Sequence, residues 1–292
     1  MSSLMQTDYV PSINDTLEVL NSTSTWADEV DVSLDEMGKR TLWSGDKLVS
    51  FEEYGIVYDR LNKPICPHLK QTTGKKGRGS LGKWGVNHAA DPLITRKYNN
   101  GKYAVLVIFR GDQEGFVPAL PGGMVDAVNG RVESYNRTLK RELCEEAIND
   151  DKKEAIKELK RAMDRGSVIY CGFVDDPRTT DNAWIETYCL HAHVEESVAN
   201  ALNLRTDGTM DKETKGAVWM DVTAENMATM YAGHGVWVTT AIALKNSKTV
   251  VRGGDYLFFN IVILSVLATV ALTSIINAFV KPTFAIEEVI DF

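Results

Sequence analysis

The chain has 292 residues, of which 44% are hydrophobic and 25% are charged, and its formal net charge is −8 at pH 7. This length accommodates one large domain or two small ones, and the composition is ordinary for a globular protein. An acidic chain lacks the electrostatic footprint of a protein that binds a phosphate backbone, so we expect no nucleic acid as its main ligand. A small anionic ligand stays open, because it needs only a local basic pocket and metal ions.

The cysteine pattern gives no support to a zinc site or a disulfide framework. Cys66, Cys144, Cys171 and Cys189 are too far apart for a CxxC motif and too few for a disulfide scaffold of this length. We therefore expect reduced thiols in a cytosol-facing domain. The segment Met1 to Thr16 has neither a positive flank nor an apolar run, so it does not resemble a signal peptide.

The first hundred residues give weak signals of structure. Residues 1 to about 35 are polar and acidic, which on composition alone predicts a loop or weak structure. Glycines and basic residues crowd together from Gly74 to Gly85, and this pattern predicts a loop or linker with a local positive charge, or simply a solvated connector. The continuous apolar run from Tyr103 to Phe109 then predicts a strand that is buried on both faces.

Helices and strands alternate after this strand. From about Ser134 to Ile148 the pattern is helical, because Leu139, Leu143 and Ala147 recur every four residues and form an apolar stripe. The elements expected beyond it are a helix at Asp151–Met163, strands at Val168–Val174, Trp184–Ala192 and Gly216–Val222, and a helical region at Ala224–Lys245. This alternation predicts an α/β or α+β class.

The C-terminal segment has the pattern of a membrane anchor. Tyr256 to Val280 contains no charged residue, and about 20 apolar residues are enough to span a bilayer. Lys245, Lys248 and Arg252 precede it, so the positive-inside rule places the preceding domain in the cytosol. We expect a single-pass tail anchor over 256–280 and a short tail over 281–292, on a membrane that the sequence does not identify. A buried core helix is the alternative, although such helices are usually shorter.

Three carboxylates are concentrated in the predicted helix at 134–148. Glu142, Glu145 and Glu146 are at positions i, i+3 and i+4, which share one face of an α-helix. Three carboxylates on one face repel one another, and a divalent cation such as Mg²⁺, which takes oxygen ligands, relieves that repulsion. The apolar stripe on the opposite side would pack on a sheet and leave the acids facing a cleft. Taken alone, an ordinary solvated acidic face is the simpler interpretation.

The surrounding residues change that interpretation. With the turn Pro121–Gly123 and with Glu133, the segment Arg141–Glu146 resembles the box of the Nudix hydrolases. That box has a glycine, five residues, a glutamate, seven residues, and then Arg-Glu-aliphatic-x-Glu-Glu. The spacing from Glu133 onward fits, whereas nine residues, Met124 to Val132, separate the glycine from Glu133, and Ile148 stands where a glycine is usual. The longer loop raises the question of whether the glycine and Glu133 lie as they do in the family.

The resemblance implies a fold, a metal and a set of ligands. The fold is the Nudix α/β/α sandwich with a mixed sheet, so the α/β class is the one expected. The metal is Mg²⁺, with Mn²⁺ as the alternative ion. The residues implied to bind it are Glu133, Glu142, Glu145 and Glu146. Arg141 would fix the rotamers of these carboxylates by bidentate hydrogen bonding.

Two further segments narrow the resemblance. Gly85–Pro92 and Val174–Trp184 resemble the ADP-ribose pyrophosphatases of mitochondrial type, a branch that includes the ADP-ribose-sensing domain of melastatin-type cation channels. The resemblance covers roughly residues 9 to 245. It implies a folded N-terminal lobe over 1–90, in place of the loose segment suggested by composition, and a Nudix hydrolase domain over 91–250.

Four substrate-binding residues follow from this branch. Asp176 and Arg178 match positions that contact the ribose and the phosphates of the ligand, and Tyr231 and His234 match a pair that contacts the terminal ribose or its phosphate. The arginine fork suits a diphosphate, because it can bind two oxygens at once. Without the resemblance, Arg178 could equally form a surface salt bridge with Asp175 or Asp181, and His234 would more often be a structural histidine.

The resemblance implies Mg²⁺-dependent hydrolysis of the pyrophosphate of ADP-ribose to AMP and ribose 5-phosphate. The complete set of acids in the box favours this enzyme over an ADP-ribose sensor without turnover, whereas the longer loop after Gly123 argues for the sensor. A membrane scaffold in which the Nudix domain is secondary is a third alternative. The general base, the physiological ADP-ribose derivative and the oligomeric state are left open by the sequence.

Overall fold

The computed structural model describes residues 39–112, 115–128, 131–149, 151–206 and 214–247. The chain divides into two units, residues 1–241 and residues 242–292, and the description below concerns the first. The anchor and tail expected over 256–292 lie outside the described residues. In the part of the chain that is described, no helix is long and apolar enough to cross a membrane.

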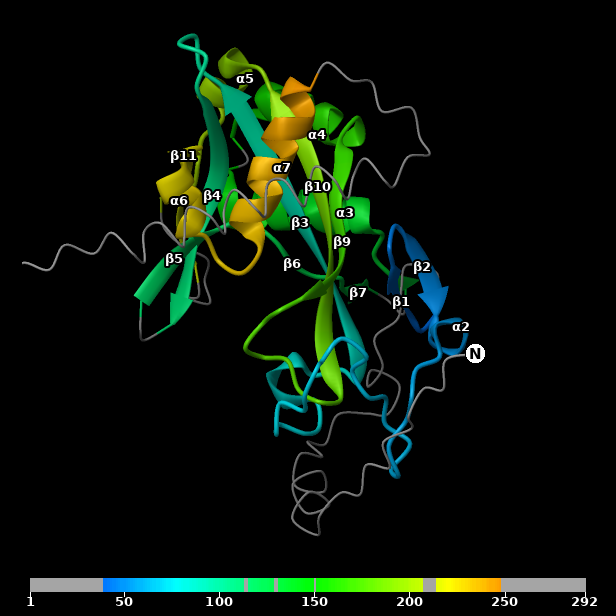
Figure 1. Ribbon diagram of the computed structural model, residues 1–292. Helices are drawn as coiled ribbons and strands as arrows, with labels where there is room; N and C mark the ends of the chain where they lie inside the picture. Colours follow the sequence, from blue (N-terminus) through cyan, green and yellow to red (C-terminus); the bar gives the residue numbers. More distant parts are fainter. Residues whose placement is uncertain (1–38, 113–114, 129–130, 150, 207–213, 248–292) are drawn as a thin grey trace, which may run out of the picture. The chain divides into compact units, whose positions relative to one another are not determined.

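The centre of the fold is a mixed, seven-stranded sheet (Figure 1). Its strands lie in the order β11–β4–β3–β10–β9, with β5 paired to β4 and β6 paired to β3. They are β3 (Gly85–Lys97), β4 (Tyr103–Asp112), β5 (Gly115–Ala119), β6 (Gly123–Met124), β9 (Ser167–Val174), β10 (Ala183–Val194) and β11 (Thr214–Asp221). Only β3 and β10 run parallel among these pairs, in continuous register over twelve residues of each strand. All four strands predicted from apolar runs are confirmed, and so is the α/β class.

Strand β3 is the main element that the hydrophobic pattern did not predict. Asn87, His88 and Pro92 interrupt its apolar run, and yet Asn87 and His88 are only 2% exposed. The Asn87 side chain is satisfied inside the protein, where Nδ2 donates to the carbonyl oxygens of Lys83 and Gly85 at 3.0 and 3.2 Å. Pro92 lies between the stretches of β3 that pair with β6 and with β4, so at this position β10 is the only strand of the described residues that pairs with β3.

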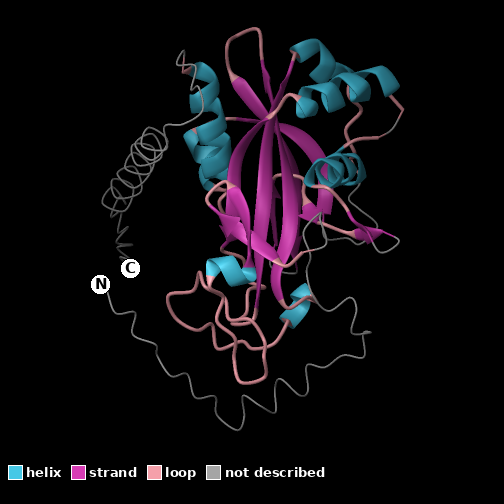
Figure 2. Cartoon of the chain, turned by 90° about the vertical axis from the view of Figure 1, so that its right-hand side faces the viewer, coloured by secondary structure: helices cyan, strands magenta, loops and turns pink. Residues whose placement is uncertain are grey.

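Helices cover both faces of the sheet (Figure 2). On one side α3 (Tyr135–Glu142) contacts β3, and α4 (Lys153–Asp164) contacts β10 and α5 (Glu196–Ala201). On the other side lies the first part of α7 (His234–Asn246), as far as Ala241. The main core fills the space between the sheet and α3 and α4. The predicted stripe of Leu139, Leu143 and Ala147 lies in this core with at most 1% exposure, which confirms its role.

Two predicted helices differ in detail from the observed ones. The helical region expected at 224–245 is divided into α6 (Ala224–Ala228) and α7, because Ala232 between them has a left-handed backbone with φ of 45°. The helix expected at 134–148 is α-helical only to Glu142 and continues as the π-helical segment η3 (Leu143–Ala147). It ends at Ile148, whose extended backbone, with φ −130° and ψ 132°, leaves the helix.

A second, smaller core joins residues 41–86 to the sheet. It is formed around the hairpin of β1 (Thr41–Ser44) and β2 (Lys47–Ser50) and the short helix α2 (Phe51–Tyr54). Its buried members are Leu42, Phe51, Ile56, Cys66, Val86 and Trp184. The glycine-rich segment that follows contains a single 3₁₀ turn, η2 (Gly79–Leu81), and is held by hydrogen bonds to the chain around Thr180 and Asp181. It is therefore a fixed part of the fold and not a solvated connector.

A buried carboxylate links this smaller core to the sheet. Glu186 on β10 is completely buried and accepts three hydrogen bonds. Its Oε2 accepts from the backbone N–H of Trp43 at 2.6 Å, and its Oε1 accepts from Nε2 of His68 at 2.9 Å and from Nε1 of Trp184 at 3.0 Å. The carboxylate of Glu186 thus connects the hairpin, the following loop and the sheet.

We expect Glu186→Leu to lower the free energy of unfolding by about 3 kcal/mol or more, because several buried donors lose their acceptor at once. Glu186→Gln keeps one acceptor oxygen and should cost less. Urea denaturation with a constant m-value measures both effects. An unchanged midpoint for Glu186→Leu would contradict the role of this carboxylate.

Candidate active site

The longer loop after Gly123 forms a small hairpin. Strands β7 (Ala127–Val128) and β8 (Arg131–Val132) pair antiparallel, and the N–H of Glu133 donates to the carbonyl oxygen of Asp126 at 2.8 Å to close its base. Because a hairpin returns the chain to its starting point, the extra residues do not separate the glycine turn from Glu133. Nη2 of Arg141 reaches both sides of the hairpin, bonding to the carbonyl oxygen of Met124 at 3.0 Å and to Oε2 of Glu133 at 2.9 Å.

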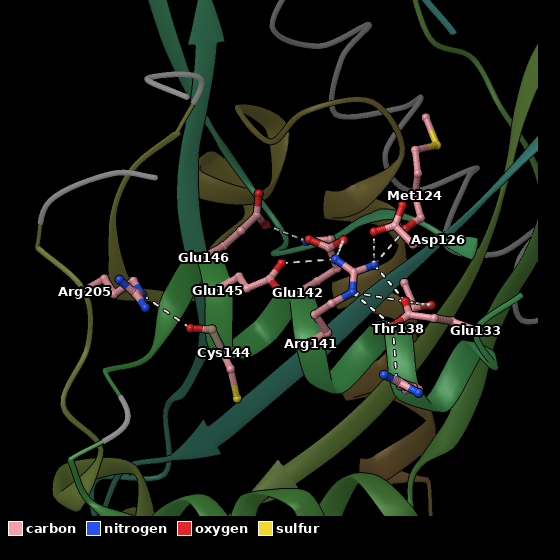
Figure 3. A network of polar contacts seen from close by, with 12 residues as sticks. Met124, Asp126, Glu133, Thr138, Arg141, Glu142, Cys144, Glu145, Glu146 and Arg205 are labelled. Carbon is pink, nitrogen blue, oxygen red and sulfur yellow. Dashed lines mark hydrogen bonds and ion pairs between the residues drawn. The ribbon is translucent and has the colours of Figure 1, made fainter. Parts of the chain in front are cut away.

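Arg141 lies at the centre of a cluster of carboxylates (Figure 3). Its Nε and Nη2 bond to Oε2 of Glu133 at 3.0 and 2.9 Å. Its Nη1 bonds to Oε1 of Glu142 at 2.6 Å and to Oε2 of Glu145 at 3.1 Å. One guanidinium group therefore brings three of the four predicted metal ligands together.

The fourth carboxylate, Glu146, is held by a different arginine. Its Oε1 accepts from Nη2 of Arg110 at 2.9 Å, and its Oε2 accepts from the N–H of Gly122 at 2.8 Å. The prediction placed Glu142, Glu145 and Glu146 on one face of a regular α-helix, whereas Glu145 and Glu146 lie in the π-helical segment. The π-helical turn over 143–147 changes the angular spacing of these side chains, so that Glu145 is exposed while Glu146 is 9% exposed and turns toward the glycine turn.

Burial makes negative charge costly at two of these residues. Burial raises the pKa of Glu146 to about 7, against the opposing effects of Arg110 and the Gly122 N–H, and repulsion from Glu142 adds to the increase. Burial likewise raises the pKa of Glu142, although Arg141 opposes it. Two desolvated carboxylates that repel each other form an environment that a further cation would stabilise.

The glycine turn has no room for side chains. A Cβ on Gly123 would lie 2.4 Å from Oε1 of Glu142, and one on Gly122, whose φ is +159°, would lie 2.0 Å from Oδ1 of Asp91. The absence of side chains thus lets the turn approach the carboxylates closely enough for the Gly122 N–H to bond to Glu146.

A second cluster brings together three of the predicted substrate-binding residues. Asp176, which follows β9, accepts from Nε and Nη2 of Arg178 at 2.8 and 2.9 Å and from the hydroxyl of Tyr231 at 2.8 Å. Although burial opposes it, the Arg178 and Tyr231 hydrogen bonds hold the pKa of Asp176 below its ordinary value. Arg178 therefore pairs with Asp176, which was not among the neighbouring aspartates considered from the sequence, Asp175 and Asp181.

His234, at the start of α7, is buried beside this cluster. Its ring lies 5.8 Å from the Tyr231 ring, and its Nδ1 accepts from the backbone N–H of Leu120 at 2.9 Å. Burial lowers the pKa of His234 to about 3, and the positive charge of Arg110 adds to the decrease. The neutral ring fixes the chain just before the glycine turn, so the second cluster is connected to the first.

Arg110, on β4, lies between the two clusters and was not identified from the sequence. Its Nη2 donates to the carbonyl oxygen of Gly122 at 2.7 Å as well as to Glu146. In the sequence, Arg110 is a single cation that follows the apolar run 103–109. Many strands end in a charged residue, so this position alone did not indicate a role. Its place in the site depends on the pairing of β4 with distant parts of the chain.

The four carboxylates are chemically suited to bind a divalent cation, although in this structure they contact arginines. Among the described residues, no three acidic, histidine or cysteine side chains are arranged to enclose a metal ion. Here Glu133, Glu142 and Glu145 contact Arg141, and Glu146 contacts Arg110. Carboxylate oxygens are nevertheless the ligands that Mg²⁺ and Mn²⁺ take, and all four come from 14 consecutive residues, 133–146.

The fold and the site define an α/β domain with a carboxylate cluster beside a glycine turn, and comparison with known proteins gives its family. No family model matches the chain. The nudix hydrolase 6 of Caenorhabditis elegans is 36% identical over 220 residues, which cover 74% of this chain and 77% of that protein. The chain therefore belongs to the Nudix hydrolase family.

Two other relatives indicate the branch within the family. The mitochondrial ADP-ribose pyrophosphatase of Rattus norvegicus is 36% identical over 191 residues, which cover 57% of this chain and 50% of that protein. The transient receptor potential cation channel subfamily M member-like 2 of Nematostella vectensis is 35% identical over 207 residues, which cover 64% of this chain and 13% of the channel. The resemblance to both groups, stated from the sequence motifs, is confirmed.

We predict that His234 makes stability depend on pH in the acidic range. Its pKa is about 3 in the folded protein and about 6.5 when unfolded, so between these values the unfolded chain binds more protons and stability falls as the pH falls. His234→Asn keeps an acceptor for the Leu120 N–H and does not titrate. The stability advantage of the unsubstituted protein over this variant should therefore shrink from pH 7 to pH 4.

Urea midpoints at pH 7, 6, 5 and 4 measure this difference. The carboxylates with raised pKa values are common to both proteins and cancel in the comparison. A difference that stays constant over this range would show that His234 is not held neutral by burial.

Proposed function

We propose that this protein hydrolyses the pyrophosphate of ADP-ribose to AMP and ribose 5-phosphate with Mg²⁺, or alternatively Mn²⁺. The observation that carries the proposal is the convergence of Glu133, Glu142 and Glu145 on Arg141, with Glu146 buried beside them. A similar protein from rat is named as an ADP-ribose pyrophosphatase, which supports this substrate.

The box residues would bind the metal and keep it in place. Glu142, Glu145 and Glu146 would be its main ligands after rotating away from their arginines, with Glu133 as a further carboxylate that stays bonded to Arg141. When bound, the ion would neutralise charge on the diphosphate and lower the pKa of the attacking water. Arg141 would retain its bonds to Glu133 and to the Met124 carbonyl, and so would keep α3 aligned with the glycine turn.

The second cluster would hold the rest of the substrate. Asp176 would accept hydrogen bonds from ribose hydroxyls, and it keeps the Arg178 guanidinium in one orientation through two hydrogen bonds. Arg178 would bind phosphate oxygens, and Tyr231 and His234 would contact the terminal ribose. Because the Tyr231 hydroxyl donates to Asp176, this hydrogen bond would keep the residue for the terminal ribose in a fixed position relative to Asp176 and Arg178.

The full chain should release AMP from ADP-ribose in the presence of Mg²⁺, and Glu145→Gln/Glu146→Gln should reduce the rate by about 10²–10⁴-fold, because the metal loses two ligands. The pair Glu154→Gln/Glu158→Gln on the exposed face of α4 is the matched control and should leave the rate unchanged. AMP release is followed by chromatography. Equal rates for both double variants would contradict the proposed metal site.

An ADP-ribose sensor is the second candidate, and the similarity to a melastatin-type channel is the observation that favours it. In a sensor the carboxylates would stay with Arg141 and Arg110 when ADP-ribose binds. Saturable ADP-ribose binding by the full chain without AMP release would support this function over hydrolysis. Neither binding nor turnover would exclude both candidates and would favour the third, a membrane scaffold.

We further propose that residues 256–280 anchor the protein in a membrane as a single-pass helix, with the domains at 1–90 and 91–250 in the cytosol and a short tail at 281–292. The uncharged apolar composition of the segment supports this topology. Local hydrolysis of ADP-ribose at that membrane is one role for the anchor.

The anchor is tested by Leu264→Lys/Leu267→Lys in the full chain. Two charges near the middle of the segment oppose insertion by several kcal/mol, so the variant should move from the membrane pellet to the soluble fraction after alkaline extraction. Lys245→Leu/Lys248→Leu lies outside the segment and should stay in the pellet. Recovery of the unsubstituted protein in the soluble fraction would rule out the anchor.

A further inference from the structure

Arg110 has hydrogen-bonding capacity that the protein does not use. An arginine carries five N–H donors. Nη2 of Arg110 bonds to Glu146 and to the Gly122 carbonyl, whereas within the described residues Nη1 and Nε donate to no partner. Nε is buried, whereas Nη1 is not among the buried unpaired atoms and the side chain is 29% exposed, so the donors of Nη1 are open to a ligand.

The position of Arg110 suits an anionic ligand. It contacts Glu146 in the first cluster, and its charge acts on Tyr231 and His234 in the second. Burial raises the pKa of Asp91 to about 6, and Arg110 and Arg178 both oppose this increase, so the two guanidinium groups lie around the same region. Two arginines that both act on Asp91, one of them bonded to a candidate metal ligand, provide positive charge suited to a diphosphate.

We propose that Arg110 binds a non-bridging phosphate oxygen of the substrate through Nη1 while Nη2 continues to hold Glu146. This inference rests on the proposed function, because it places the diphosphate between the carboxylate cluster and Arg178. Arg110 would then contribute directly to the recognition of diphosphates, and it would also align the substrate with the carboxylate on which the metal depends.

A comparison of four proteins separates substrate contact from an effect transmitted through Glu146. The dissociation constant of ADP-ribose is measured by calorimetry for the unsubstituted full chain, Arg110→Gln, Glu146→Gln and the double variant, with EDTA present to prevent turnover. Loss of a charged hydrogen bond should weaken binding about 10–100-fold. The decisive expectation is that Arg110→Gln weakens binding by this factor in the Glu146→Gln background as well.

The opposite result in that background would overturn the proposal. If Arg110→Gln has no effect once Glu146 is replaced, then Arg110 acts only by positioning Glu146. Arg110→Lys keeps the charge but not the planar fork, so in the same background it should lose part of the affinity and serves as a milder variant if the glutamine variant unfolds. Arg161→Gln, an exposed arginine on α4, is the matched control and should bind normally.

The same measurements distinguish failure of this inference from failure of the proposed function. If the unsubstituted chain binds ADP-ribose and Arg110→Gln/Glu146→Gln binds no worse than Glu146→Gln, only the inference fails. If the unsubstituted chain neither binds ADP-ribose in EDTA nor releases AMP from it in Mg²⁺, both fail. Binding without hydrolysis in Mg²⁺ would overturn the hydrolase but leave the role of Arg110 decided by the four-protein comparison.

Discussion

Buried negative charge around α3 is the constraint on which the geometry of the site depends. Glu133, Glu142 and Glu146 are each at most 9% exposed, and carboxylates in such surroundings need cations and hydrogen-bond donors. Arg141 provides them from the same helix, and Arg110 provides them from β4. Because the two arginines come from different elements, the helix, the glycine turn and the sheet must keep fixed relative positions for all the charges to be satisfied.

The same constraint accounts for local features that look irregular in isolation. The turn at Gly122 and Gly123 carries no side chains because carboxylates occupy the space where each Cβ would lie. The π-helical segment turns Glu146 toward that turn and leaves Glu145 exposed. The hairpin at 127–132 absorbs the longer loop without moving Glu133 away from Arg141. Each feature accompanies the close approach of charged groups at this site.

Much of the fold was predictable from local patterns, because these record burial directly. The apolar runs at 103–109 and 168–174 gave their strands, and the period of Leu139, Leu143 and Ala147 gave the helical face that packs on the sheet. Strand β3 was missed because Asn87 and His88 make it look polar, and their burial depends on hydrogen bonds to partners that the pattern does not reveal.

The sequence by itself determined the family resemblance, the α/β class and the spacing of the acids, since these depend on residue types along one stretch of chain. Only the tertiary structure decided which charges meet. It paired Arg178 and Tyr231 with Asp176, directed Glu146 to Arg110, and brought His234 to Leu120 just before the glycine turn. These contacts join residues on different elements. Whether two charges pair depends on their distance in space, which the packing of strands and helices sets. No local sequence pattern encodes that distance.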